Sequence, residues 1–157
     1  METMIKETTY LCVKQKEAIL DLWNSEYPAQ LKYNSLAEFE NYLDGLSDKR
    51  HLLLITDAGE IAGWALNFLR NSEQWFAIIL NRKIQRQGFG ARLLDELKKN
   101  NTALNGWVVD HNNSPKSDGT VYPSPLAFYL KNGFTMQQDI RIKNEKLSAV
   151  KIEWRRQ

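Results

Sequence analysis

Residues 75–99 combine three features whose order restricts how the chain can fold. An apolar run with the composition of a strand comes first, at Trp75–Leu80. A basic segment with two glycines follows at residues 81–90. Ala91–Lys99 then has the composition of a helix, with an apolar face made by Leu93, Leu94 and Leu97. The stretch therefore predicts a strand, a tight glycine turn and a helix, in that order.

The expected helix start has the properties of an anion site. Gly88 and Gly90 let the backbone turn tightly and approach a ligand without a Cβ in the way. The first turn of a helix has unpaired N–H groups, and its dipole favours negative charge there. Nearby cations are Arg82, Lys83, Arg86 and Arg92. A phosphate-bearing ligand is therefore the expected occupant.

A plainer interpretation stays open, because a Gly-x-Gly pair alone is common. The spacing fits neither a Walker A loop nor the fingerprint of dinucleotide binders, since Leu93 stands where the latter needs a third glycine. On these residues alone, an ordinary strand-to-helix turn with solvated arginines is an equal alternative.

Two short blocks resemble the signatures of the GCN5-related N-acetyltransferase (GNAT) family. Gln85-x-x-Gly88-x-Gly90 is similar to the Gln/Arg-x-x-Gly-x-Gly/Ala signature. Phe128–Phe134, Phe-Tyr-Leu-Lys-Asn-Gly-Phe, looks like the later aromatic-Tyr-x-Lys-x-Gly-Phe block. The blocks come in the family's order and at about its usual separation. The order of expected elements also agrees from about Thr8 to Trp154.

The resemblance implies that the chain uses acetyl-CoA as acyl donor and no metal. The implied cofactor-binding residues are Leu80, Asn81, Arg82, Gln85, Arg86, Gln87, Gly88, Phe89, Gly90, Ala91 and Arg92. The strands ending near Leu80 and Val109 should be a parallel pair that splays apart and leaves a V-shaped cleft. Pantetheine would run along the edge of the first of these strands, as an added strand does.

Tyr129 matches the family's general-acid position. A phenol with a pKa near 10 stays protonated at neutral pH and can donate a proton; the alternative is a core aromatic residue on a helix face. No general base is assigned. Gln74 stands where the family often has glutamate, and strand alternation points the adjacent Glu73 to the opposite face. Asp110, His111 and a water chain remain candidates. The second block also has Tyr122 and Pro125 where the family often has Asn and Ala.

Periodicity and turn residues predict the other elements. The expected strands are Thr9–Val13, His51–Thr56, Ile61–Leu69, Glu73–Leu80, Leu104–Val109, Ile140–Ile142 and Val150–Trp154. The other expected helices are Glu17–Glu26, one capped by Ser35 and Glu38, and one beginning at Ser124 and Pro125, with Leu126, Tyr129 and Leu130 on one face. Asp110–Tyr122 is a long polar loop. The pattern predicts a mixed α/β (α+β) fold with a mainly antiparallel sheet of six to seven strands and helices on both faces.

Composition limits the class of protein. A chain of 157 residues with 43% hydrophobic content is expected to form one domain over 1–157. The net charge of +2 is too mild to predict nucleic-acid or membrane partners. The single cysteine, Cys12, excludes an internal disulfide and is expected to be buried in a strand. No apolar run approaches the ~18 residues of a membrane span, and the start lacks a signal-peptide core. A cytoplasmic location is expected.

These features together predict an acetyl-CoA-dependent N-acetyltransferase. The acceptor would be a primary amine of a small molecule, amino acid or peptide, which attacks directly in a ternary complex. Substrate choice is expected in Glu26–Asn34, Trp64, Trp107 and the Asp110–Tyr122 loop, whose aromatic and acidic groups suit a cationic amine. Two alternatives stay open. One is a non-catalytic acyl-CoA sensor of the same fold, and the other is a nucleotide-phosphate binder of an unrelated class.

Overall fold

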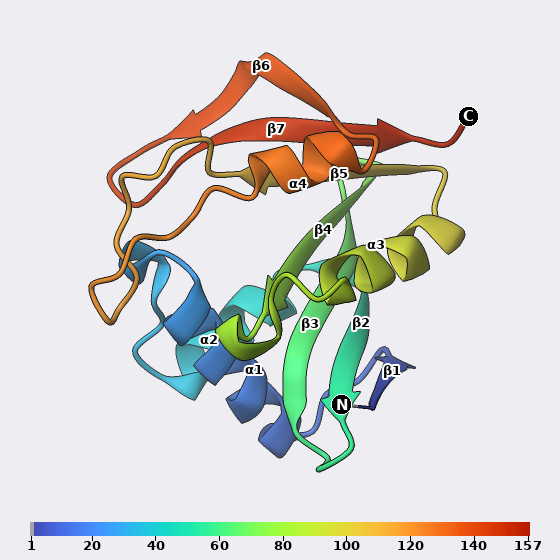
Figure 1. Ribbon diagram of the computed structural model, residues 1–157, viewed down its shortest axis with the longest axis vertical. Helices are drawn as coiled ribbons and strands as arrows, with labels where there is room; N and C mark the ends of the chain where they lie inside the picture. The colour runs from blue at the N-terminus through green and yellow to red at the C-terminus, as the bar shows by residue number, and fades with distance from the viewer. Residues whose placement is uncertain (1) are drawn as a thin grey trace.

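One seven-stranded sheet organises the molecule (Figure 1). The computed structural model describes residues 2–157. The prediction about the start of the chain includes Met1, which lies outside these residues. The strands are β1 (Thr3–Thr8), β2 (Ser47–Thr56), β3 (Ile61–Arg70), β4 (Glu73–Leu80), β5 (Ala103–Val108), β6 (Thr135–Lys143) and β7 (Ser148–Arg155). Their order across the sheet is β1-β2-β3-β4-β5-β7-β6.

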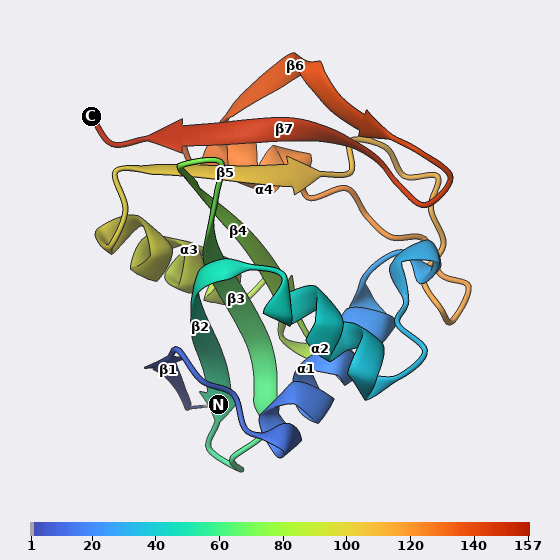
Figure 2. The same cartoon turned by 180° about the vertical axis from the view of Figure 1, so that it is seen from behind.

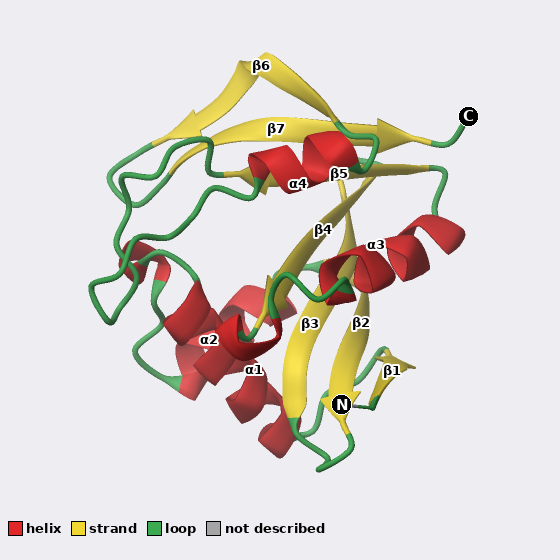
Figure 3. Cartoon of the chain, in the orientation of Figure 1, coloured by secondary structure: helices red, strands yellow, loops and turns green. Residues whose placement is uncertain are grey.

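Helices lie on both faces of this sheet. They are α1 (Val13–Glu26), α2 (Leu36–Asp44), α3 (Phe89–Lys99) and α4 (Leu126–Lys131), with short 3₁₀ turns η1 (Ala29–Leu31) and η2 (Arg82–Ile84). α3 and α4 lie in front of the sheet in Figure 3, whereas α1 and α2 lie in front in the reverse view of Figure 2. The predicted α/β (α+β) fold class is confirmed. Within residues 2–157, no helix has both the length and the apolar character needed to cross a membrane.

Each face has its own core. Ile19, Trp23 and Phe39 pack with Trp64 under α1 and α2. The other core, under α3 and α4, contains Leu93, Leu94, Leu97, Tyr129 and Phe134. Complete burial of a leucine is worth about 1.5–3 kcal/mol relative to leaving it exposed. The fully buried Leu93 and Leu94 therefore hold α3 firmly against the sheet, as the predicted apolar face requires.

β4 and β5 are the one parallel pair of neighbours in the described sheet, and they meet at a single register pair, Trp75↔Asn105. On its other side β4 pairs with β3 along its whole length, from Arg70↔Glu73 to Gly63↔Leu80. Beyond Trp75, the edge of β4 that faces β5 has no strand partner in residues 2–157, and the two strands diverge (Figure 1). The predicted splay is confirmed.

The N-terminal segment differs from the prediction. The strand expected at Thr9–Val13 is wrong: β1 ends at Thr8, whose Oγ1 donates to the Tyr10 carbonyl at 2.7 Å and turns the chain. α1 begins at Val13, earlier than expected. Cys12 is exposed rather than buried. Its backbone N–H donates to Gln15 Oε1 at 2.9 Å, because this residue precedes a helix and its free donor needs a partner.

Two other helix starts differ from the prediction in detail. Ser35 Oγ accepts the Glu38 N–H at 3.2 Å as predicted, but the Glu38 carboxylate accepts the N–H of Asn34 rather than that of Ser35. α4 begins at Leu126, one residue later than expected, and its N–H donates to Ser124 Oγ at 3.3 Å.

The end of α4 follows the prediction with one exception. Gly133 stops the helix with φ 90°, and the Phe134 N–H returns to the Tyr129 carbonyl at 3.1 Å. Tyr129 is buried on the predicted apolar face, but Leu130 is exposed. Phe128 instead packs beside Tyr129, with ring centroids 5.0 Å apart.

Candidate active site

Residues 81–91, which form the turn after β4 and the first residues of α3, are called the glycine turn below. The first backbone bond of α3 runs from the Arg92 N–H to the Gly88 carbonyl at 3.2 Å, so the N–H groups just before Arg92 have no partner within the helix. Gly88 has φ 87°, contributes no capping side chain, and has nothing within 4 Å of the place where a Cβ would lie. The helix start is therefore open and rich in backbone donors.

Gly90 has a different role from Gly88. A Cβ at Gly90 would lie 3.2 Å from Phe128 Cζ and 3.5 Å from Leu80 Cδ1. Glycine here lets the helix start approach α4 and the end of β4 closely. The open donors at Gly88 and this close approach fit a pyrophosphate at the helix start, with the rest of the ligand leading toward the splay.

Amide side chains stabilise the glycine turn by hydrogen bonds to neighbouring backbone groups. Gln85 Nε2 donates to the Leu80 carbonyl at 2.9 Å, and Gln87 Nε2 donates to the Lys83 carbonyl at 3.2 Å. Asn81 Oδ1 accepts the Lys83 N–H at 2.9 Å. These residues fix the path of the backbone, so their side chains have a structural task in the turn.

The cations predicted at the turn are not all directed toward it. Arg86 is exposed with φ 64°. Arg92 Nη1 instead donates to Thr3 Oγ1 at 2.7 Å, on β1. Phe89 is buried and packs with Ile84, and Leu80 and Ala91 are half-buried.

Arg82 belongs to a network that sequence reasoning missed. Its Nη1 donates to Asp118 at 2.6 Å, and its backbone N–H donates to Glu26 Oε2 at 3.1 Å. The other oxygen of Glu26 accepts from Lys116 Nζ at 3.0 Å, and the side chains of this pair are only 5% and 8% exposed. The Glu26 carboxylate therefore joins the end of α1 to both the glycine turn and the loop before α4.

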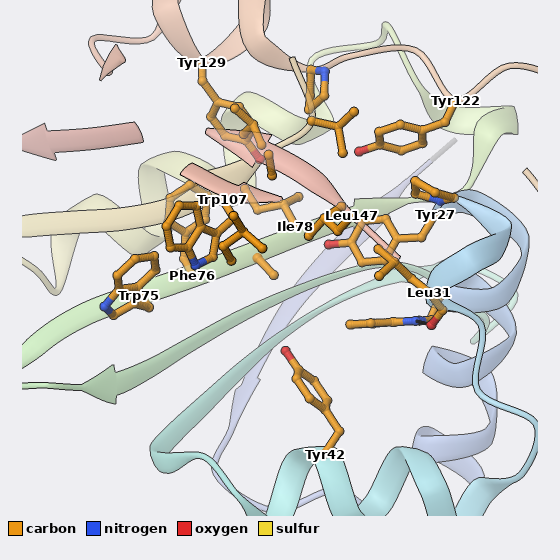
Figure 4. A pocket seen from close by; sticks show the side chains of 18 of the residues that line it. Tyr27, Leu31, Tyr42, Trp75, Phe76, Ile78, Trp107, Tyr122, Tyr129 and Leu147 are labelled. Atoms are coloured by element: carbon orange, nitrogen blue, oxygen red, sulfur yellow. Dashed lines mark hydrogen bonds between the residues drawn. The ribbon is translucent and has the colours of Figure 1, made fainter. Parts of the chain in front are cut away.

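A cavity of about 330 Å³ opens where β4 and β5 diverge. Its lining comes from α1, the α1–α2 segment, α2, β3, β4, β5, the loop before α4, α4 itself and the β6–β7 hairpin. Tyr27, Tyr42, Tyr122 and Tyr129 direct their hydroxyl groups into it (Figure 4). We call it the tyrosine cavity.

The four hydroxyl groups of the tyrosine cavity are free to bind a ligand. Within residues 2–157, none of their Oη atoms makes a hydrogen bond. Burial raises the pKa of Tyr42 and of Tyr122 to about 12. Burial also raises the pKa of Tyr27 and of Tyr129 well above the ordinary value. All four phenols therefore keep their protons at neutral pH.

The cavity is also aromatic and short of negative charge. Trp75 and Trp107 stack across the closed end of the splay, with ring centroids 5.4 Å apart. Arg70 lines the cavity with its guanidinium carbon 4.9 Å from the Phe68 ring centroid, and no carboxylate of residues 2–157 belongs to the lining. The expectation of acidic groups around the acceptor is therefore wrong for this cavity. Trp64 is fully buried in the core, whereas Trp107 lines the cavity.

The candidate bases all lie outside this lining. The carboxylate of Glu73 lies 3.9 Å from Lys151 Nζ. Asp110 forms a two-point pair with Arg141, at 3.1 and 2.7 Å, which lowers the pKa of Asp110. His111 Nδ1 accepts the Asn113 N–H at 3.1 Å. Gln74 Oε1 accepts from Asn67 Nδ2 at 2.9 Å. Within residues 2–157, no group of acidic, His and Cys side chains is placed to hold a metal ion.

The family model described as "Acetyltransferase (GNAT) domain" matches residues 15–155, nearly the whole chain. The chain belongs to the GNAT acetyltransferase family. The resemblance drawn from the two sequence blocks is thereby confirmed, and the interpretation as a nucleotide binder of an unrelated class no longer stands. No curated protein sequence matches the chain.

Solved GNAT structures share the fold at low identity. An aminoglycoside 6'-N-acetyltransferase complexed with coenzyme A is 14% identical with a TM-score of 0.72, covering 97% of this chain and 96% of that one. A phosphinothricin acetyltransferase from Sinorhizobium meliloti in complex with acetyl-CoA is 13% identical with a TM-score of 0.70, covering 99% and 89%. The ribosomal-protein-S18-alanine N-acetyltransferase from Escherichia coli is 18% identical with a TM-score of 0.63, covering 98% and 94%.

Proposed function

We propose that residues 1–157 form a single acyl-CoA N-acyltransferase domain. It would move an acetyl group from acetyl-CoA to a primary amine of a small molecule, amino acid or peptide, by direct attack in a ternary complex. The observation that carries this proposal is a convergence: an open helix start, an unpartnered strand edge and the Tyr129 hydroxyl meet around one splay. A cytoplasmic location stays a prediction.

The backbone of the glycine turn would hold the coenzyme's pyrophosphate. N–H groups before Arg92 supply donors, and Gly88 and Gly90 leave room for a close approach. The free edge of β4 after Trp75 can pair with an amide-bearing chain as a neighbouring strand would. When bound, acetyl-CoA supplies an acetyl group on a thioester, whose C–S bond breaks as the N–C bond to the acceptor forms.

Tyr129 would hold the proton that the departing sulfur needs. Its raised pKa keeps the Oη protonated until charge develops nearby. The acceptor nitrogen gives up one proton in the same reaction, so protons balance overall. The hydroxyl groups of Tyr27 and Tyr122 face the same cavity and can pass a proton onward through water.

The lining itself can substitute for a strong general base. An ammonium that enters the tyrosine cavity loses water without gaining a carboxylate partner from residues 2–157. Desolvation of this kind lowers the pKa of an amine. A larger fraction of the bound amine is then neutral and able to attack.

The test is a screen of primary amines with purified protein and acetyl-CoA, followed by a thiol-reactive dye and by mass of the product. We expect amine-dependent thiol release and an acetylated product. The sensor alternative is favoured by the absence of a carboxylate from the described lining. It predicts acetyl-CoA binding with no thiol release for any amine, and that result would refute the transferase.

A further inference from the structure

Arg70 is the one cation in the lining of the tyrosine cavity among residues 2–157, and its position there is stabilised by aromatic rings. Its guanidinium carbon lies 4.9 Å from the Phe68 ring centroid and 5.7 Å from that of Trp75. No salt bridge of Arg70 occurs within residues 2–157: Glu73, its neighbour across the β3–β4 turn, lies nearest to Lys151 Nζ, at 3.9 Å. The guanidinium therefore has donors to offer an incoming anion.

The lining of the tyrosine cavity also has an apolar part with flat aromatic side chains. Trp75 and Trp107 stack with an interplanar angle of 30°, and Ile78, Ile142 and Leu147 complete this part of the lining. Flat aromatic walls favour a ring or a branched apolar body. A cavity of about 330 Å³ also suits a small molecule better than a large sugar or a long polyamine.

Polar groups lie at the other side of the same cavity. The hydroxyl groups of Tyr27, Tyr122 and Tyr129 point inward where the strands separate, and none has a hydrogen-bond partner within residues 2–157. A phenol oxygen can accept a hydrogen bond from an amine, and the phenol can donate one in return. An acceptor amine directed toward these hydroxyls would lie beside the splay.

We propose that the acceptor is a primary amine with an aromatic or branched apolar body and a carboxylate that pairs with Arg70. This deepens the proposed function, on which it rests. Polyamines and aminoglycosides are disfavoured because their several positive charges would meet Arg70 and no acidic residue of the described lining. Arg70 is thus assigned as a residue that determines acceptor specificity.

The experiment compares acids with their carboxylate-free counterparts: phenylalanine with 2-phenylethylamine, and 4-(aminomethyl)benzoate with 4-methylbenzylamine. We expect the acid to have a kcat/KM at least about tenfold higher in one pair, which corresponds to one charge-assisted interaction. The pair in which the acid is preferred indicates which separation of carboxylate and amine in the acceptor fits the cavity. A carboxylate-free amine that equals or exceeds its acid in both pairs would overturn the proposal, as would preference for spermidine or kanamycin.

Variants assign the effect to one side chain. Arg70→Gln should reduce the acid-to-counterpart ratio to near one, and Arg70→Lys should restore part of it. Lys151→Gln is the matched control, because Lys151 Nζ lies 5.5 Å from the same Trp75 ring but does not line the cavity. Equal losses in Arg70→Gln and Lys151→Gln would contradict the assignment to Arg70.

A separate measurement keeps this test independent of catalysis. The same pairs are titrated calorimetrically into protein saturated with CoA. If no amine is acetylated, the proposed transferase fails, whereas tighter binding of the acid, lost in Arg70→Gln, would still support the proposed acceptor class. Equal binding of acid and counterpart would refute it.

Discussion

The glycine turn is built from one continuous stretch of eleven residues, 81–91, whereas the tyrosine cavity takes its lining from segments between Trp23 and Ala149. The turn offers mainly backbone groups, and its glycines matter because they have no Cβ. The cavity works through side chains: aromatic walls, four free phenols and one arginine. Under the proposed function, a local motif would specify coenzyme binding, whereas acceptor choice would depend on tertiary packing. This division agrees with one fold serving many acceptors.

The largest expected effect is at Tyr129, where the two regions meet. Tyr129→Phe removes the proton donor but keeps the buried ring, which packs 5.5 Å from Phe76 and 5.4 Å from Phe134. We expect kcat to fall by about 10²- to 10⁴-fold, with acetyl-CoA affinity and melting temperature unchanged. Steady-state kinetics and calorimetric titration measure these quantities. Tyr10→Phe, at an exposed tyrosine, is the control. Unchanged kcat in Tyr129→Phe would leave this residue with a packing role alone.

Glu26→Gln should break the link between the two regions. It leaves Lys116 buried without its charge partner and weakens the contact with the Arg82 backbone. Removing one member of a buried pair costs about 3–5 kcal/mol of unfolding free energy, measurable by urea denaturation. We also expect weaker binding of both substrates.

Asp118→Asn serves as the comparison for Glu26→Gln, because Asp118 contacts the same arginine from an exposed position. An exposed pair contributes less than about 1 kcal/mol. Equal losses in the two variants would show that the buried carboxylate has no special role in joining the glycine turn to the loop.

Two glycines with nearly the same positive φ allow the effect of backbone strain to be separated from the effect on binding. Gly88 has φ 87° and Gly119 has φ 88°, and a Cβ at either would meet nothing within 4 Å. Alanine at either position costs about 1–2 kcal/mol of backbone strain. We expect only Gly88→Ala to weaken acetyl-CoA binding. If the strain raises the free energy of the bound state by ~1.4 kcal/mol relative to the free protein, the dissociation constant increases about tenfold. Equal weakening by Gly119→Ala would show that strain anywhere in the site has this effect.

The smallest effect is expected at Asp110, which belongs to neither region. Arg141 lowers the pKa of Asp110 in the folded protein, so the pair stabilises the fold above the unfolded pKa, and this stability is lost as pH falls through the folded pKa. Asp110→Asn should therefore cost about 0.2–1 kcal/mol at pH 7 and progressively less below about pH 4. Because Asp110 lies outside the cavity lining, kcat of the Asp110→Asn variant should not change. A large loss of kcat would instead support Asp110 as the general base.

The parts that the sequence predicted well are those set by neighbours along the chain. The strand, turn and helix at 73–99, the hairpins and the Gly133 stop depend on local periodicity and on glycine conformation. The local rule failed at Thr9–Val13, which was interpreted as a strand although only Leu11 is buried there.

The rest depends on contacts between distant residues. Glu26 and Lys116 are 90 positions apart, and nothing local distinguishes Glu26 from other helix carboxylates. Tyr27 and Tyr42 reach the cavity only because α1 and α2 pack beside the splay. Arg70 is the last residue of β3, a strand of ordinary composition. The signal that could have found it is strand alternation, since Arg70 shares its face of β3 with the buried Phe68.

The single pair Trp75↔Asn105 has a consequence for how the molecule opens. Strands β1–β4 and β5–β7 are two ladders joined at one point, so the backbone amides of Phe76–Leu80 that face the gap lack the protection of a sheet interior. A ligand that filled the gap would contact both ladders, so we expect it to protect these amides from exchange. Acetyl-CoA, the proposed donor, should therefore raise the melting temperature as its concentration increases.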